Sequence, residues 1–292
     1  GVTPRCLHRI FFGEIIMTNI NDTGMKRAAL INDYSCFGKC SLSVAIPIIS
    51  AYGSEAVALP TAILSTHTGG LGNYVVRDMT EEMLSFSAHW KELGMKFDCI
   101  YTGFFCSPRQ IEAARDFIRD FSEEDTLVLV DPVLGDNGSI YPCFSSEHIK
   151  AMRRLCRYAD VITPNITEAA LLTGMSTDTE AEELCFSLRS SLDVRNVVVT
   201  GVRDGDKIGY HADFDGREVR IMKDYADVSL HGTGDVFSSA FCGELLSGKD
   251  MAAALADAAD FCDRCVKATL RRLPSHWYGL AFEDVLKEMR EI

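Results

Sequence analysis

The sequence has few features that would tie it to a membrane or to nucleic acid. Its 292 residues contain no uninterrupted apolar run as long as a membrane-spanning helix requires. Basic residues are scarce relative to acidic ones, 29 against 42, and the formal net charge is −13. Because each contacted phosphate of a nucleic-acid backbone needs a lysine or an arginine, this balance argues against nucleic-acid binding. It does not argue against a nucleotide held in a local pocket by backbone amides and a metal ion.

Several signatures of catalysis and phosphate binding are also absent. The chain has neither a G-x-S-x-G nucleophile turn nor an H-E-x-x-H metal motif. The stretch GKCS at 38–41 resembles the end of a phosphate-binding P-loop, but Asp33 stands where that motif requires its first glycine. We therefore exclude a P-loop. The sequence also lacks internal repeats, low-complexity tracts and long linkers.

Cysteine, in contrast, is abundant. The 11 cysteines are scattered and often lie in apolar stretches, which is typical of free thiols packed as small hydrophobic residues. This distribution favours a reducing compartment, and we expect a cytoplasmic protein. Cys262 and Cys265 form one CxxC pair, but no second pair follows at the spacing of a zinc site. We interpret them as packed thiols.

The first 24 residues differ from the rest. The stretch RCLHRIFFGEIIM places basic residues before a short apolar segment, as a signal peptide does, but Gly13 and Glu14 interrupt it and no clear cleavage site follows. We expect residues 1–24 to be a disordered or extraneous leader, with natural starts at Met17 or Met25. Residues 25–292 are expected to form one domain, since 47% hydrophobic residues suffice for a large core.

Strand-like and helix-like segments alternate from residue 27 onward. We expect strands at 27–33, 55–62, 97–103, 126–132, 160–164 and 196–201, and a hairpin of 206–212 and 217–223. We expect helices at 40–52, 80–93, 108–121, 146–159, 166–173, 179–190, 234–247, 250–271 and 280–291. This order predicts an α/β fold of three layers, in which a mostly parallel central sheet carries helices on both faces.

Ligands of such sheets bind at the carboxyl ends of the strands. Polar residues or glycines follow the expected strands at this edge: Asp33, Thr102, Gly103, Asp131, Thr163, Asn165, Thr200 and Gly201. We therefore expect the functional site there.

The stretch HGTGD, residues 231–235, precedes a helix-like apolar run. Gly232 and Gly234 permit a sharp turn and a close approach to a ligand, and the following helix would direct free N–H groups at the turn. Capping of the helix by Thr233 or Asp235 is the alternative interpretation. In the functional interpretation, the amides hold a phosphoryl group in transit and Asp235 accepts the proton of the attacking hydroxyl.

Two further stretches carry carboxylates near the same edge. Asp131 and Asp136, in VDPVLGDNGSIY, suit Mg²⁺ held through water or the charged end of a nucleotide, although an ordinary turn is the alternative. Asn165 and Glu168, in TPNITEAALL, are spaced as a capping box. Glu168 could also lie on the water shell of the metal, and the two roles are compatible.

Four segments resemble the ribokinase-like superfamily and, within it, the pyridoxal kinases. They are STHTG (65–69), DPVLGDNGSIY (131–141), ADVITPNITEAALLTG (159–174) and GTGDVFSSAF (232–241), in this order. The resemblance runs from about Ala28 to about Thr269. It implies an enzyme that uses ATP and Mg²⁺ to phosphorylate the 5′-hydroxymethyl group of a B6 vitamer. It also implies a three-layer α/β/α fold, commonly a homodimer, and often assistance by K⁺.

The resemblance also assigns roles by position. It implies that Asp235 is the general base. The anion cradle would consist of Gly232, Thr233 and Gly234, and the metal-side acids would be Asp131 and Glu168. It places on the nucleotide side Asp136, Asn165, Thr200, Gly201 and Thr233. The residues that it places around the vitamer are Leu64, Thr68, Phe104, Tyr141 and Asp235.

The residue after the first strand departs from this pattern. Many members of the family carry serine there, to meet the pyridine ring, whereas this chain has Asp33. A carboxylate can pair with a protonated ring nitrogen or a substrate amine. We predict that Asp33 shifts the preference toward protonated vitamers, in particular pyridoxamine.

Three other functions remain as alternatives. A hydroxymethylpyrimidine kinase of the same superfamily often carries cysteine where this chain has Asp235, so Asp235 and the DNGSIY loop favour a B6 vitamer. A sugar kinase of the superfamily usually carries a strand-built lid, for which residues 62–80 are too few. A catalytically silent vitamer- or nucleotide-binding protein would need the same pocket but no base, and the intact acids argue against it.

Overall fold

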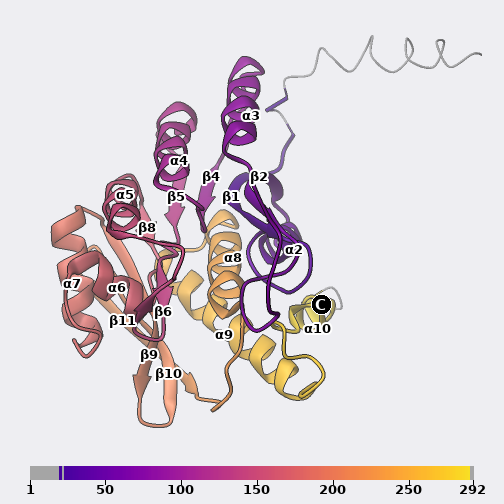
Figure 1. The fold of residues 1–292 in the computed structure, drawn as a ribbon. Coiled ribbons are helices and arrows are strands. Elements are labelled where there is room, and N and C mark those ends of the chain that lie inside the picture. The colour runs from indigo at the N-terminus through magenta and orange to yellow at the C-terminus, as the bar shows by residue number, and fades with distance from the viewer. Residues whose placement is uncertain (1–19, 22, 290–292) are drawn as a thin grey trace, which may run out of the picture.

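The computed structural model describes residues 20, 21 and 23–289. Within these residues, nine strands form one sheet in the order β11-β10-β9-β8-β5-β4-β1-β2-β3, and helices cover both of its faces (Figure 1). This arrangement confirms the predicted three-layer α/β fold. The expected leader, residues 1–24, lies almost entirely outside the described residues. Among the helices of the described part, none has the length and apolar character to span a membrane.

The centre of the sheet is parallel and its edges are antiparallel. The parallel strands are β2 (Glu55–Leu64), β1 (Arg27–Ser35), β4 (Cys99–Thr102), β5 (Leu127–Val130), β8 (Val161–Ile162) and β9 (Asn196–Asp204). The antiparallel strands are β3 (Val76–Asp78), β10 (Lys207–Phe214) and β11 (Arg217–Asp224). A separate short ribbon consists of β6 (Gly135–Asp136) and β7 (Ser139–Ile140). The sequence pattern does not predict β3, β6 or β7, because two or three residues are too few to show a period of two.

The helices divide between the two faces. One face carries α3 (Thr80–Glu92), α4 (Pro108–Phe121), α5 (Ser146–Cys156), α6 (Ile166–Thr173) and α7 (Ala181–Leu192). The other carries α2 (Leu42–Ala51), α8 (Thr233–Leu246), α9 (Met251–Leu270) and α10 (Phe282–Met289). Each lies where the helical periodicity predicts it. Figure 1 shows α8 beside the middle of the sheet, with α9 next to it.

Strand β1 shows why the central strands are apolar without a break. Ala29 and Ile31 belong to the core under α3–α7, whereas Ala28 and Leu30 belong to the core under α2 and α8–α10. Successive side chains of a strand point to opposite faces. Because helices cover both faces, this strand is apolar without a break from Ala28 to Ile31.

The chain reverses its direction of progress across the sheet at β1, since β2 lies on one side of it and β4 on the other. A crevice forms at such a point, outside the carboxyl ends of the two strands. The backbone N–H of Phe104 donates to Asn32 Oδ1 at 2.8 Å across this point. Gly103 has no space for a side chain, because a Cβ there would lie 2.3 Å from Asn32. Asn32 therefore holds the ends of β1 and β4 in register at the expected location of the site.

The aromatic cluster below α4 offers a test of the packing. Phe117 is 3% exposed and stacks on Phe121 with ring centroids 4.3 Å apart. We expect Phe117→Ala to lower the free energy of unfolding by about 3–5 kcal/mol, because it leaves a cavity. Guanidinium titration followed by tryptophan fluorescence measures this. Phe186→Ala, at a side chain that is 69% exposed, should change stability by less than about 0.5 kcal/mol. Equal effects of the two substitutions would contradict the described packing.

Candidate active site

Helix α8 begins in the HGTGD turn. Its N-cap is Gly232, which has φ +79° and no space for a side chain, since a Cβ there would lie 2.1 Å from the Lys39 carbonyl oxygen. Among the described residues no side chain forms a cap hydrogen bond with this helix, so capping by Thr233 or Asp235 is wrong. Gly234 is exposed, and a Cβ there would meet no atom within 4 Å. The first amides of α8 are therefore free to bind an anion that approaches closely.

Asp235 lies in the first turn of α8 and is partly buried. Burial raises the pKa of its carboxyl to about 7, and the negative charge of Asp33 adds to the rise. The nearby backbone N–H of Ser41 and the side-chain amide of Asn32 favour the ionised form and oppose the rise in pKa. A carboxyl with a pKa near neutrality can accept and release a proton at physiological pH.

Asp33 lies near the end of β1 and is 5% exposed. The hydroxyl of Ser41 donates to one of its oxygens at 2.5 Å, and the hydroxyl of Ser35 donates to the other at 3.1 Å. Burial raises the pKa of the Asp33 carboxyl, and the two hydroxyls oppose the rise. The structure thus brings Asp33 within electrostatic reach of Asp235.

Asp131 directly follows β5 and is buried. Burial raises the pKa of its carboxyl, and the negative charge of Asp235 raises it further. The hydroxyl of Ser238, on α8, donates to Asp131 Oδ2 at 3.1 Å and opposes this rise. The hydroxyl of Thr163, which follows β8, lies 3.1 Å from that of Ser238. Helix α8 therefore carries one site carboxylate and contacts a second.

Glu168 lies in the first turn of α6, buried, with Asn165 as the N-cap. The Glu168 N–H donates to Asn165 Oδ1 at 2.9 Å, and the Asn165 N–H donates to Glu168 Oε2 at 2.8 Å. The predicted capping box is confirmed. Burial and the charge of Asp131 raise the pKa of Glu168, whereas N–H donation by Asn165 and Leu134 lowers it. Glu168 is thus a helix cap and also part of the acidic cluster.

Four residues expected on the nucleotide side are neighbours in the structure: Asp136, Asn165, Thr200 and Gly201. Asn165 Nδ2 donates to the carbonyl of Gly135 at 2.9 Å, next to the exposed Asp136. Asn165 also pairs with Thr200 in an isolated bridge. Gly201 has φ +72° and is the extra residue where the pairing of β9 with β10 shifts register. This bulge turns the backbone of β9 beside Thr200.

The residues expected around the vitamer are brought together only in part. Tyr141 and Phe104 both pack on Phe144, with ring centroids 6.1 and 5.6 Å apart. Burial raises the pKa of the Tyr141 hydroxyl, and the charges of Glu168, Asp136, Asp235 and Asp131 add to the rise. Leu64 is buried at the end of β2, whereas Thr68 is exposed and forms no hydrogen bond within the described part of the chain. The roles of Leu64, Phe104, Thr68 and Tyr141 stay predictions.

The loop that carries Ser41 is held by residues far along the chain. Lys39 Nζ pairs with Glu283 and lies 4.7 Å from the ring centroid of Phe282. Gly279 packs against the same lysine, since a Cβ there would lie 2.4 Å from Lys39 Cβ. Two loops therefore meet at Lys39, and one of them supplies the donors to Asp33 and Asp235.

The acidic cluster is suited to a divalent cation shared with a ligand. The charge of Asp235 raises the pKa of Asp131, and the charge of Asp131 raises the pKa of Glu168. A cation would relieve both repulsions. Carboxylate oxygens are the ligands that Mg²⁺ prefers. No group of three or more His, Cys, Asp or Glu in the described residues is arranged to hold a metal alone. A Mg²⁺ ion here would complete its shell with water and phosphate oxygens.

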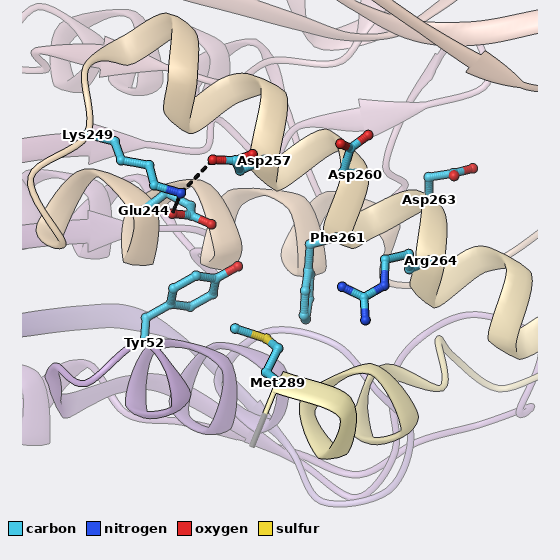
Figure 2. Close-up of a pocket in the computed structure, with 9 residues that line it drawn as sticks. All are labelled: Tyr52, Glu244, Lys249, Asp257, Asp260, Phe261, Asp263, Arg264 and Met289. Atoms are coloured by element: carbon cyan, nitrogen blue, oxygen red, sulfur yellow. Dashed lines mark hydrogen bonds and ion pairs between the residues drawn. The ribbon is translucent and has the colours of Figure 1, made fainter. Parts of the chain in front are cut away.

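A surface pocket of about 440 Å³ lies elsewhere, along α9 (Figure 2). Figure 2 shows Lys249 between Glu244 and Asp257, with which it pairs at 2.7 and 2.5 Å. Glu244 follows Asp235 by nine residues on α8, which is about 13 Å along the helix axis. Because its charges are paired and it contains none of the predicted site residues, we do not assign the function to this pocket.

Sequence reasoning missed four residues that lie beside the carboxylates: Asn32, Ser35, Ser41 and Ser238. Ser238 left a usable signal. A serine that faces the core within the apolar run VFSSAF needs a hydrogen-bond partner, so the sequence alone indicates that such a partner exists. The other three left none, since nothing in the sequence shows which backbone or side-chain groups will face Asp33 and Asp235.

Comparisons with known proteins place the chain among small-molecule kinases. A family model described as phosphomethylpyrimidine kinase matches residues 45–277. A Bacteroides thetaiotaomicron protein assigned to the same kinases is 38% identical, with a TM-score of 0.88 over 93% of this chain and 96% of that chain, and another of its structures is a form with pyridoxal. Pyridoxal kinase from Lactobacillus plantarum is 31% identical, with a TM-score of 0.84 over 90% of this chain and 96% of that one. The pyridoxine/pyridoxal/pyridoxamine kinase of Bordetella pertussis is 29% identical over 76% of this chain and 82% of its own length.

The raised pKa of Asp235 predicts a pH-dependent cost to stability. Its carboxyl ionises near pH 3.8 when unperturbed and near pH 7 in the folded chain, so the folded state binds an extra proton between these values. Stability therefore falls as the pH rises from about 4 to about 7, and the full cost persists above pH 7. We expect Asp235→Asn, which has no charge to bury, to raise Tm at about pH 8 by roughly 2–6 °C.

Calorimetry of the ligand-free protein between about pH 5 and pH 8 measures this difference. The gain should shrink as the pH falls toward 4. Asp125→Asn, at an exposed turn, is the control and should change Tm little at any pH. A gain that is the same at every pH would contradict the raised pKa.

Proposed function

The chain belongs to the phosphomethylpyrimidine kinase family, and we propose that it transfers a phosphoryl group from ATP to the 5′-hydroxymethyl group of pyridoxal, pyridoxine or pyridoxamine. Family membership makes it a kinase that phosphorylates an alcohol group. The observation that carries the proposed substrate is the Bacteroides protein, 38% identical over nearly the whole chain, which has been solved with pyridoxal. The names of the Lactobacillus and Bordetella relatives support the same class of substrate.

In this proposal Asp235 is the general base. Its carboxylate accepts the proton of the vitamer hydroxyl as the oxygen attacks the phosphoryl group, and a pKa near 7 suits this transfer at neutral pH. The free amides at Gly232, Thr233 and Gly234, with the positive end of the α8 dipole, stabilise the negative charge that spreads over the phosphoryl oxygens. The absence of a side chain at Gly234 leaves space for that approach.

The nucleotide side follows from the other two acids. Asp131 and Glu168 would hold Mg²⁺ through water, and the ion would neutralise charge on the phosphates. Asp136, Asn165, Thr200, Gly201 and Thr233 would line the path of the nucleotide. The resemblance to pyridoxal kinases adds K⁺, for which we propose a supporting role in binding the same phosphates.

On the vitamer side, Tyr141 would close over the ring, and Leu64 and Phe104 would form its apolar walls; Tyr141 and Phe104 both pack on Phe144. Thr68 lies exposed on its loop and would meet the substrate only when that loop closes. Asp33 would meet the ring nitrogen or the substrate amine. A single domain over residues 25–292, a homodimer and a cytoplasmic location stay predictions. Light scattering of the purified protein tests the homodimer.

The experiment that tests the proposed function is an ADP-release assay with MgATP and K⁺. Pyridoxal, pyridoxine, pyridoxamine and hydroxymethylpyrimidine are compared side by side. Turnover of B6 vitamers above that of the pyrimidine supports the proposal. Turnover of the pyrimidine alone would assign the chain to hydroxymethylpyrimidine phosphorylation. Binding of a vitamer without turnover of any of the four would favour a catalytically silent binding protein.

Replacement of the base should separate chemistry from binding. We expect Asp235→Asn to reduce kcat by about 10²–10⁴-fold while the Kd values for nucleotide and vitamer change by less than about fivefold. In wild type, kcat/KM should rise with pH and level off above about pH 7, since the base must be deprotonated. Steady-state kinetics and calorimetric titration measure the two effects. Near-normal turnover by the variant would show that Asp235 is not the base.

The charge of Asp33 should set the preference among vitamers. We expect Asp33→Ser to lower kcat/KM for pyridoxamine about tenfold relative to pyridoxine, because the cationic amine loses its carboxylate partner. Asp33→Asn keeps the shape and removes the charge, so it should show the same shift. If neither substitution alters the ratio of the two kcat/KM values, Asp33 has no part in selecting the vitamer.

A further inference from the structure

We propose that Ser238 is a positioning residue for phosphoryl transfer. Its hydroxyl lies on α8, the helix that carries Asp235, and orients the Asp131 carboxylate to bind the Mg²⁺ ion of the nucleotide. The inference rests on the proposed function, since it assigns Asp131 to the metal side. Ser238 lies within the segment GTGDVFSSAF, but the family resemblance assigns it no role, and it lies outside the motif HGTGD.

The location of Ser238 requires a partner for its hydroxyl. Ser238 is 1% exposed, and its neighbours Val236, Phe237, Ala240 and Phe241 are all buried apolar side chains of the core. An unpartnered hydroxyl in such surroundings costs free energy that an alanine would avoid. The hydrogen-bond partners of the Ser238 hydroxyl therefore explain why a serine can occupy this buried position.

The adjacent serine shows what an ordinary helical serine does. The hydroxyl of Ser239 donates to the carbonyl of Asp235, four residues earlier on the same helix, at 2.5 Å. In the described part of the chain, Ser238 forms no such bond to its own helix. Its hydroxyl instead reaches the sheet and donates to Asp131 Oδ2 at 3.1 Å. The two adjacent buried serines therefore have different hydrogen-bond partners: Ser239 bonds to its own helix, and Ser238 bonds to a carboxylate at the end of a strand.

The direction of the hydrogen bonds follows from proton count. To hold a cation Asp131 must be ionised, and an ionised carboxylate only accepts, so the single proton of Ser238 then points to Asp131. Thr163 Oγ1, 3.1 Å from Ser238 Oγ, must then donate to the serine. Asp131 and Thr163 follow the adjacent parallel strands β5 and β8. A relay of two hydroxyls therefore ties α8 to the ends of two central strands.

This relay opposes a specific force. The charges of Asp131 and Asp235 repel each other, and the repulsion tends to rotate Asp131 away from the site. Ser238 is three residues from Asp235 on one face of α8, so its bond fixes Asp131 relative to the base. Without the hydroxyl, Asp131 would lose the donor that orients it toward a metal. Loss of such an outer partner of a metal ligand typically weakens metal affinity about 10–100-fold.

The test is calorimetric titration of the full chain with ADP, in the presence of Mg²⁺ and in the presence of EDTA. We expect Ser238→Ala to weaken binding of MgADP about tenfold and to leave binding of metal-free ADP unchanged within about twofold. Ser239→Ala, an equal truncation one residue away, should change neither. Ser238→Thr restores a hydroxyl and should recover most of the MgADP affinity. In kinetics, Ser238→Ala should lower kcat while KM for the vitamer stays within about twofold.

Several results would overturn the inference. An equal loss with and without Mg²⁺ would mean that Ser238 only supports packing, and no loss in either condition would mean that Asp131 does not depend on it. If Ser238→Ala does not fold, Thr163→Val removes the upstream donor without altering α8, and it should still weaken MgADP binding selectively, by about threefold. An absence of that selective effect would equally refute the relay. Wild type without turnover on any vitamer would refute the proposed function, while the Mg²⁺-selective effect of Ser238→Ala would still uphold the relay.

Discussion

The burial of several carboxylates at the carboxyl ends of the central strands is the constraint on which the rest of this site depends. Burial raises the pKa of Asp33, Asp131, Glu168 and Asp235, and several of these groups raise one another further. Such a cluster persists only if neighbours hold each group in place. The neighbours are N–H groups and hydroxyls that point inward: Ser35, Ser41, Ser238 and the backbones of Leu134, Asn165 and Ser41. Burial of these carboxylates lowers the stability of the folded chain, but it keeps their reactive oxygens close together.

The fold supplies this arrangement through the ends of its strands. Asp33 lies near the end of β1 and Asp131 follows β5, while Glu168 and Asp235 begin helices that return to the same edge. Asn32 joins the ends of β1 and β4 where the strand order reverses, the point at which ligands of such sheets bind. A rigid sheet edge thus positions groups that repel one another.

Much of this was predictable from the sequence because it depends on short-range patterns. The unbroken apolar runs predict the central strands, and the spacing of Asn165 and Glu168 predicts the capping box that the structure contains. The alternative interpretation, capping by Thr233 or Asp235, is wrong because the N-cap is Gly232, in a left-handed conformation, and among the described residues no side chain bonds to this helix end. The bond from Ser238 to Asp131 spans 107 residues, and no local pattern encodes which carboxylate a buried serine will meet.

The contact of Lys39 with Gly279 and Glu283 has a consequence for synthesis of the protein. The lysine and its ion-pair partner are 244 residues apart, and the loop of Lys39 carries the groups that bond to Asp33 and Asp235. While residues 279–283 are still untranslated, that loop lacks the contacts of Lys39 with Gly279 and Glu283. The emerging chain can form its central sheet before this, but its acidic cluster is completed only once those residues are made. The part of the site around Asp33 and Asp235 therefore depends on contacts that form late in synthesis.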